Sequence, residues 1–131
     1  MKKPAAPKAG PTALSGQEIS KRLKAELPQW VYADGAIERR YGTGGWKASM
    51  LLAGAIGHLA EAAWHHPELT ISYPGVKVRL NTHDADGVSE RDFALAARIE
   101  ALVMWRPAQE AGALEGTPQG DERYTYVKYG G

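Results

Sequence analysis

Cysteine is absent from the 131 residues of this chain. Disulfide bonds, thiolate nucleophiles and thiolate metal ligands are therefore excluded. An excess of one charge is also absent, because 16 Lys and Arg stand against 15 Asp and Glu, for a net charge of +1. Nucleic-acid-binding domains usually carry a strongly basic face, so this balance argues against DNA or RNA as the main partner.

Long hydrophobic runs are also lacking. The longest apolar stretch, Met50–Ile56, is far shorter than the ~20 residues that a membrane-spanning helix needs. Lys2 and Lys3 are not followed by the apolar segment of a secretory signal. We therefore expect a cytoplasmic, soluble protein without a membrane partner, long enough for one domain with its own hydrophobic core.

Proline and glycine divide the chain into three parts. Residues 1–13 are rich in Lys, Pro and Ala and are expected to form a disordered tail. Residues 14–104 carry the periodic apolar patterns of a folded domain. Residues 105–131 form an extension that begins with a loop rich in Gly and Pro and ends with a β-prone segment, residues 123–129. That segment could add a strand to a sheet edge.

Helical patterns occur in three places. Residues 15–27 begin with Ser15 and Glu18 at the spacing of a capping box and end before Pro28. Residues 46–64 form a long run rich in Ala and Leu, which we expect Pro67 to stop. Residues 89–103 begin with Ser89 and Asp92, again at capping-box spacing, which predicts that Asp92 is the N3 residue of the third helix.

Four short β-prone runs lie between the helices. The first two, residues 30–32 and 36–41, flank Asp34-Gly35, a typical hairpin dipeptide. The next two, residues 69–73 and 76–81, flank Pro74-Gly75, which fits the middle of a type II turn. The order α-β-β-α-β-β-α predicts an α+β fold, in which a four-stranded antiparallel sheet carries the helices on one face.

Three histidines follow the ends of these elements. His65 and His66 end the second helix, and His83 follows the last strand. A helix end and a strand end could place three imidazoles around one pocket, where they would suit proton transfer near neutral pH. Glu61, four residues before His65, would share its helix face.

Plainer interpretations stay open. Histidines at a helix end are often surface or capping residues that the helix dipole favours. His58, Glu61 and His65 have an i, i+3, i+7 spacing that could hold a metal, although this spacing is common on helices and matches no recognised ligand motif. We expect no metal and no cofactor.

The spacing of the polar residues resembles the signature of the pterin-4a-carbinolamine dehydratase family. The matching positions are Glu61, His65-His66-Pro67, Tyr73, His83 and Asp92, within a similarity that covers about residues 14–103. The resemblance implies the fold above, assembly into homodimers or homotetramers, and acid-base roles for His65 and His83. It also implies that His66 positions a pterin and that Glu61 orients the histidines. The expected substrate-binding residues are Pro67, Tyr73, Thr82, Asp84 and Asp92.

The chain also departs from that family. Leu69 stands where Trp is common, Tyr73-Pro74 stands where Tyr-Asn is common, and the extension is additional. The extension resembles that of dehydratase-like proteins encoded with α-carboxysome genes, which are regarded as Rubisco assembly factors. The favoured hypothesis is therefore a non-catalytic Rubisco assembly factor associated with the carboxysome of an autotrophic bacterium. Its rival is an active dehydratase that converts 4a-hydroxytetrahydrobiopterin to quinonoid dihydropterin.

Overall fold

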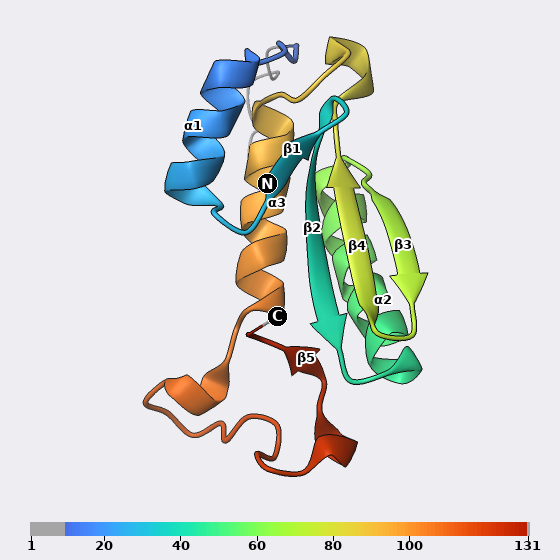
Figure 1. Ribbon diagram of the computed structural model, residues 1–131, viewed down its shortest axis with the longest axis vertical. Helices are drawn as coiled ribbons and strands as arrows, with labels where there is room; N and C mark the ends of the chain where they lie inside the picture. Colours follow the sequence, from blue (N-terminus) through green and yellow to red (C-terminus); the bar gives the residue numbers. More distant parts are fainter. Residues whose placement is uncertain (1–9, 131) are drawn as a thin grey trace, which may run out of the picture.

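A computed structural model describes residues 10–130, so residues 1–9 of the tail predicted for residues 1–13 lie outside the described part. Three helices and an antiparallel sheet form the fold (Figure 1). The helices are α1 (Gly16–Glu26), α2 (Trp46–Ala63) and α3 (Glu90–Val103), with 3-10 turns η1 (His83–Ala85), η2 (Pro107–Gln109) and η3 (Glu122–Tyr124). The strands are β1 (Val31–Ala33), β2 (Ala36–Thr43), β3 (Glu68–Ser72), β4 (Gly75–Leu80) and β5 (Val127–Lys128).

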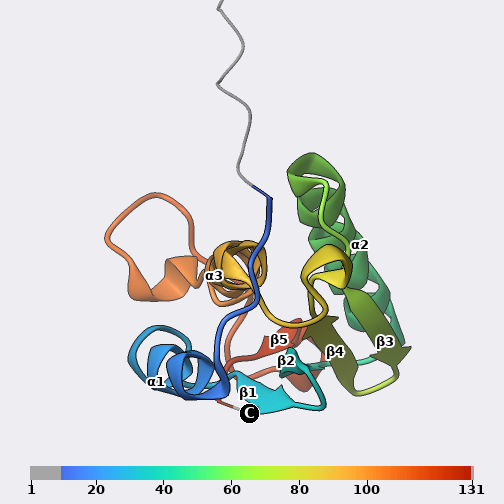
Figure 2. The ribbon, with the colours of Figure 1, turned by 90° about the horizontal axis from the view of Figure 1, so that it is seen from above.

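The sheet has the strand order β1-β2-β4-β3, and β5 pairs with β2. Gly42 of β2 pairs with Gly75 on one side and with Lys128 on the other. Strand β5 therefore continues the edge that β1 occupies. Seen from above, α2 and α3 lie on one side of the sheet (Figure 2). The predicted α+β fold is confirmed, and the β-prone end of the extension supplies a fifth strand that is shorter than predicted.

The helix boundaries follow local capping chemistry. The Ser15 hydroxyl accepts a hydrogen bond from the Glu18 amide, and α3 begins with a complete capping box formed by Ser89 and Asp92. The end of α2 differs from the prediction, because Trp64 adopts a left-handed conformation with φ 53° and ends the helix before Pro67 can act. Pro67 restricts only the backbone of His66, the residue directly before it. The helix has already ended two residues before His66, at the left-handed Trp64.

The second hairpin corrects one prediction. Ser72 pairs with Gly75, so Tyr73 and Pro74 are the two loop residues, and Gly75 is the first residue of β4 rather than part of a type II turn. Glycine is required there for another reason. A Cβ on Gly75 would lie 2.4 Å from the Tyr41 carbonyl oxygen on the neighbouring strand. Close approach of two backbones excludes any side chain at this position.

The hydrophobic core lies between the sheet and the helices. Alternate residues of β4 point into it, and α2 and α3 each bury one face against them. The fully buried large side chains are Ile19, Ile37, Leu52, Ile56, Val76, Val78, Leu80, Val88 and Ile99. Within residues 10–130, no helix combines the length and the apolar character that a membrane crossing requires.

A carboxylate from α3 organises the polar part of the core. One oxygen of Glu100 accepts hydrogen bonds from the Tyr41 hydroxyl at 2.7 Å, the Trp30 indole N–H at 3.0 Å and the Arg39 Nε–H at 3.2 Å. Burial alone would raise the pKa of Glu100, but these three donors outweigh it and hold that pKa below its usual range. The carboxylate thereby stabilises the packing of α3 on β2.

We expect Glu100→Gln to lower the free energy of unfolding by about 2 kcal/mol at neutral pH, because it removes the charged acceptor and leaves the buried Arg39 guanidinium without its counter-ion. Since the pKa of Glu100 is lowered by folding, its contribution is present above the unfolded pKa of about 4.3 and is lost as the pH falls further. Urea titrations at neutral and acidic pH would measure both effects. Glu110→Gln, an exposed residue of the extension, is the matched control. Equal stability of the two variants at neutral pH would contradict the assignment.

Candidate acid-base site

The buried carboxylate of Asp92 lies at the centre of the candidate site. Its side chain is 0% exposed. One oxygen lies 2.6 Å from Nε2 of His65. The other accepts a hydrogen bond from the Thr82 hydroxyl at 2.7 Å and one from the Ser89 amide at 2.9 Å. The predicted helix-capping role of Asp92 is therefore confirmed, and the same carboxylate also holds a histidine.

His65 presents one ring nitrogen to Asp92 and leaves the other free. It is the first residue after the left-handed Trp64, and its side chain is 13% exposed. An imidazole that donates its Nε2 proton to a carboxylate keeps its lone pair on Nδ1, where it can accept a proton. The carboxylate would then stabilise the imidazolium that forms, as in catalytic triads. The arrangement is suited to general base chemistry.

Glu61 contacts His66 rather than His65. Its carboxylate lies 2.7 Å from Nε2 of His66, and the Trp64 ring packs edge-on against the same imidazole at a centroid distance of 5.0 Å. The sequence analysis placed Glu61 and His65 on one helix face, but α2 ends at Trp64, so His65 leaves that face. Both partners of the Glu61–His66 pair are largely exposed, and water therefore weakens their attraction.

His83 lies on η1 with its side chain fully exposed, and its Nδ1 is 3.8 Å from the carboxylate of Asp84, which is also exposed. Its neighbour Thr82 is buried and bonds to Asp92. The backbone that carries His83 is thus tied to the carboxylate that holds His65. Thr82 and Asp92, predicted to bind substrate, are both buried; Asp92 contacts His65, and Thr82 directly precedes His83 in the chain.

Tyr73 lies at the other end of α2. A Cβ on Gly45, the residue that precedes α2, would be 3.5 Å from the Tyr73 hydroxyl oxygen. His65 follows the opposite end of this 18-residue helix, which spans ~27 Å. Within one chain the structure therefore does not bring Tyr73 to the histidines.

A cavity of about 640 Å³ borders His65. It lies between the end of α2 and the first two turns of α3, and neither His66 nor His83 lines it. Its lining residues are Ala63, Trp64, His65, Arg91, Ala94, Leu95 and Arg98. Arg91 and Arg98 were not predicted from the sequence as site residues, although their i, i+7 spacing places them on one helix face.

The alternative metal site is not formed. Across residues 10–130 no group of three or more His, Asp or Glu side chains could hold a metal ion. Of the three residues considered, Glu61 is turned to His66 and His65 to Asp92.

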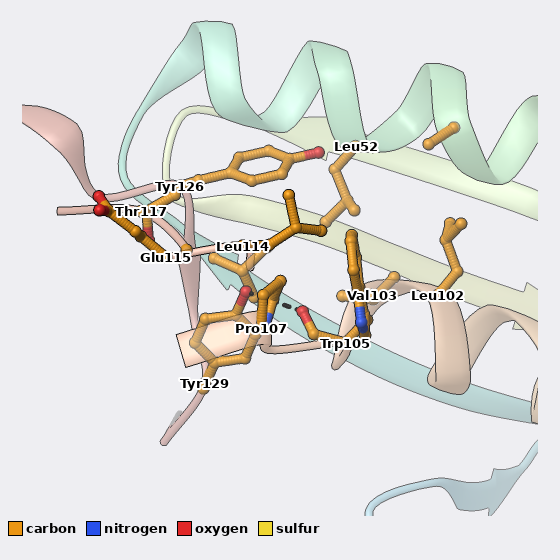
Figure 3. A pocket seen from close by; sticks show the side chains of 13 residues that line it. Leu52, Leu102, Val103, Trp105, Pro107, Leu114, Glu115, Thr117, Tyr126 and Tyr129 are labelled. Carbon is orange, nitrogen blue, oxygen red and sulfur yellow. Dashed lines mark hydrogen bonds between the residues drawn. The ribbon is translucent and has the colours of Figure 1, made fainter. Parts of the chain in front are cut away.

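The extension forms a second, apolar pocket of about 450 Å³ against α2 and α3 (Figure 3). Leu52, Val103 and Leu114 meet there, and the Tyr129 hydroxyl donates a hydrogen bond to the Trp105 carbonyl at 3.3 Å. The Gly44 amide donates to the Tyr126 carbonyl at 2.9 Å and so fixes the extension beside β2. The pocket lies at the end of α3 remote from Asp92.

Comparison with known proteins gives a consistent family assignment. The family model described as pterin 4 alpha carbinolamine dehydratase matches residues 12–102. A putative pterin-4-alpha-carbinolamine dehydratase of Aquifex aeolicus is 42% identical over 90 residues, which are 69% of this chain and 90% of the relative. One from Haloarcula marismortui is 48% identical over 90 residues, or 68% and 94%. The crystal structure of a transcriptional coactivator/pterin dehydratase from Brucella melitensis superposes with a TM-score of 0.64 at 29% identity, covering 70% of this chain and 98% of that one.

We expect Asp92→Asn to lower the free energy of unfolding by about 2 kcal/mol, since an amide has one acceptor oxygen and turns its NH2 toward at least one buried donor. Chemical denaturation would measure the loss. Asp84→Asn, at an exposed position, should change stability by less than about 0.5 kcal/mol. An Asp92→Asn variant as stable as Asp84→Asn would show that the carboxylate does not hold these segments together.

Proposed function

This chain belongs to the pterin-4a-carbinolamine dehydratase family, and we propose that its histidine site dehydrates a 4a-hydroxytetrahydropterin. The observation that carries the proposal is the buried Asp92 carboxylate, which holds His65 directly and the His83 segment through Thr82. A structural capping residue needs no histidine partner. A histidine that acts as a base, by contrast, needs a carboxylate partner that stabilises its imidazolium form.

The reaction requires two proton transfers and no change of redox state. The bond between C4a and its hydroxyl oxygen breaks, and the oxygen takes up a proton and leaves as water. The proton on N5 is removed, and the electron pair of that N–H bond forms the new C=N bond of quinonoid dihydropterin. One group must therefore act as a base toward N5 and another as an acid toward the hydroxyl.

His65 suits the base and His83 the acid. The Asp92 carboxylate lies 2.6 Å from Nε2 of His65 and would orient the ring so that Nδ1 can accept the N5 proton. His83 is open to solvent and can take up a new proton after each turnover. His66, which Glu61 holds in place, would orient the pterin together with Pro67. No metal or cofactor enters this proposal.

We expect His65→Ala and His83→Ala each to lower the rate of carbinolamine dehydration by about 10²-fold or more, the range of general acid-base catalysis. The substrate can be generated with phenylalanine hydroxylase, and quinonoid dihydropterin followed by absorbance. His58→Ala removes an exposed histidine of α2 and is the matched control. A wild-type rate equal to the uncatalysed one in folded protein would refute the proposal, as would full activity of both variants.

A second function is favoured by the extension. The family match ends at residue 102, and the Aquifex and Haloarcula relatives are covered over 90% and 94% of their own length. Residues 105–130 thus add to the family domain a surface in which Leu114 is 62% exposed beside the apolar pocket. We propose as the alternative that this surface assists Rubisco assembly, in association with the carboxysome of a bacterium. Exposed apolar surface beside a polar rim is typical of protein-binding sites.

For this alternative, we expect co-expression of the chain to raise the yield of assembled Rubisco and Leu114→Asp to abolish the increase, because a charge at that position opposes burial in an interface. His83→Ala should leave the increase unchanged. Native gel electrophoresis of the Rubisco holoenzyme is the measurement. An unchanged yield with the wild-type chain would exclude the assembly role.

Assembly into homodimers or homotetramers also remains a proposal. Met50 and Leu51 are exposed on α2, and the outer edge of β3 carries no neighbouring strand within the described chain (Figure 1). Both features are typical of surfaces that a second copy covers.

A further inference from the structure

Two arginines face the cavity beside His65. Arg91 lies in the first turn of α3 and Arg98 two turns later, and both line the cavity together with His65 and Trp64. Residues seven apart lie on the same face of a helix. Ala94, which has a small side chain, lies between them along this face and also lines the cavity.

Neither guanidinium has a carboxylate partner within the part of the chain that the structure describes. Other arginines of the fold do have one: Arg22 pairs with Glu26 and Glu90, Arg39 with Glu100, and Arg79 with Glu38. No Asp or Glu lines the cavity. Its wall therefore combines two uncompensated positive charges with an imidazole and no negative charge. An anion would complete this arrangement.

Arg98 is separated from the acid-base centre along the axis of α3. Arg98 is six residues beyond Asp92, which places it ~9 Å further along the helix axis. His65 is held at the Asp92 level, and the exposed Trp64 ring borders the same end. The side chain of a flat heterocycle held beside His65 and Trp64 could extend along α3 toward Arg98.

We propose that the cavity receives the side chain of a pterin whose ring lies at His65, that this side chain ends in an anionic group, a phosphate or a carboxylate, and that Arg98 together with Arg91 recognises this group. The proposal rests on the proposed dehydratase function for the identity of the ring. It adds that the substrate has a charged side chain rather than the neutral dihydroxypropyl chain of biopterin. Guanidinium groups bind both anions through paired N–H donors.

The test is equilibrium binding by calorimetry with pairs of related ligands, of which one carries the anionic group and the other does not. For the phosphate arm, 7,8-dihydroneopterin monophosphate is compared with 7,8-dihydroneopterin. For the carboxylate arm, 7,8-dihydropteroate is compared with its methyl ester. We expect at least one charged ligand to bind about tenfold more tightly than its neutral partner, with a preference that declines as salt rises. The arm that shows the preference identifies the anion.

Arg98→Gln should reduce this preference to less than about twofold while leaving the affinity for the neutral ligand unchanged. Arg40→Gln is the control, because Arg40 is exposed and its neighbour Arg39 points toward α3, so Arg40 lies on the opposite face of the sheet. Equal affinity for charged and neutral ligands in both arms would overturn the proposal, as would an equal preference in Arg98→Gln and wild type.

Binding and catalysis distinguish the two proposals. A charge preference that depends on Arg98, in a protein without dehydratase activity, would uphold the anion site and refute the proposed reaction. Dehydratase activity without any preference for the charged ligands would uphold the proposed reaction and refute the anion site.

Discussion

The buried Asp92 carboxylate is the interaction on which the candidate site depends. It accepts hydrogen bonds from the Ser89 amide at the start of α3, from the Thr82 hydroxyl before η1, and from His65, which lies two residues beyond the end of α2. Removing a carboxylate from water is costly unless each oxygen finds donors. Because the required donors come from three separate segments, satisfying the charge also fixes where these segments lie. Helix capping and positioning of the histidine are therefore achieved by one side chain.

The two candidate functions occupy different parts of the molecule. The Asp92–His65 pair lies at the start of α3, whereas the pocket made by the extension borders Val103 at its end. The extension is tied to the family domain through β5 and through the contact between Gly44 and Tyr126. A substitution at Leu114 and one at His83 therefore act on separate surfaces. A protein that had lost the dehydration reaction could still keep the apolar surface of the extension, and a protein without that surface could still carry out the reaction.

Glu100 on one face of α3, and Arg91 and Arg98 on another, lie in different environments. Glu100 faces the core, where three donors satisfy it and its charge stabilises the fold. Arg91 and Arg98 line the cavity beside His65, where no carboxylate of residues 10–130 pairs with them. A buried charge without a partner would destabilise the fold, but a charge at a cavity wall remains hydrated until a ligand binds. The difference in environment separates the stabilising charges from those available for recognition.

The sequence by itself determined the order of the elements, because caps, turn dipeptides and apolar periodicity act over a few residues. Ser89 and Asp92 predicted the start of α3, and Asp34-Gly35 the first hairpin. The family signature likewise identified the histidines. Only the tertiary structure decided that Asp92 holds His65, that Glu61 turns to His66, and that Tyr73 lies far from both. The physical reason is that each of these facts depends on where α2 ends and how it packs, and a left-handed Trp64 has no local sequence signal comparable to glycine.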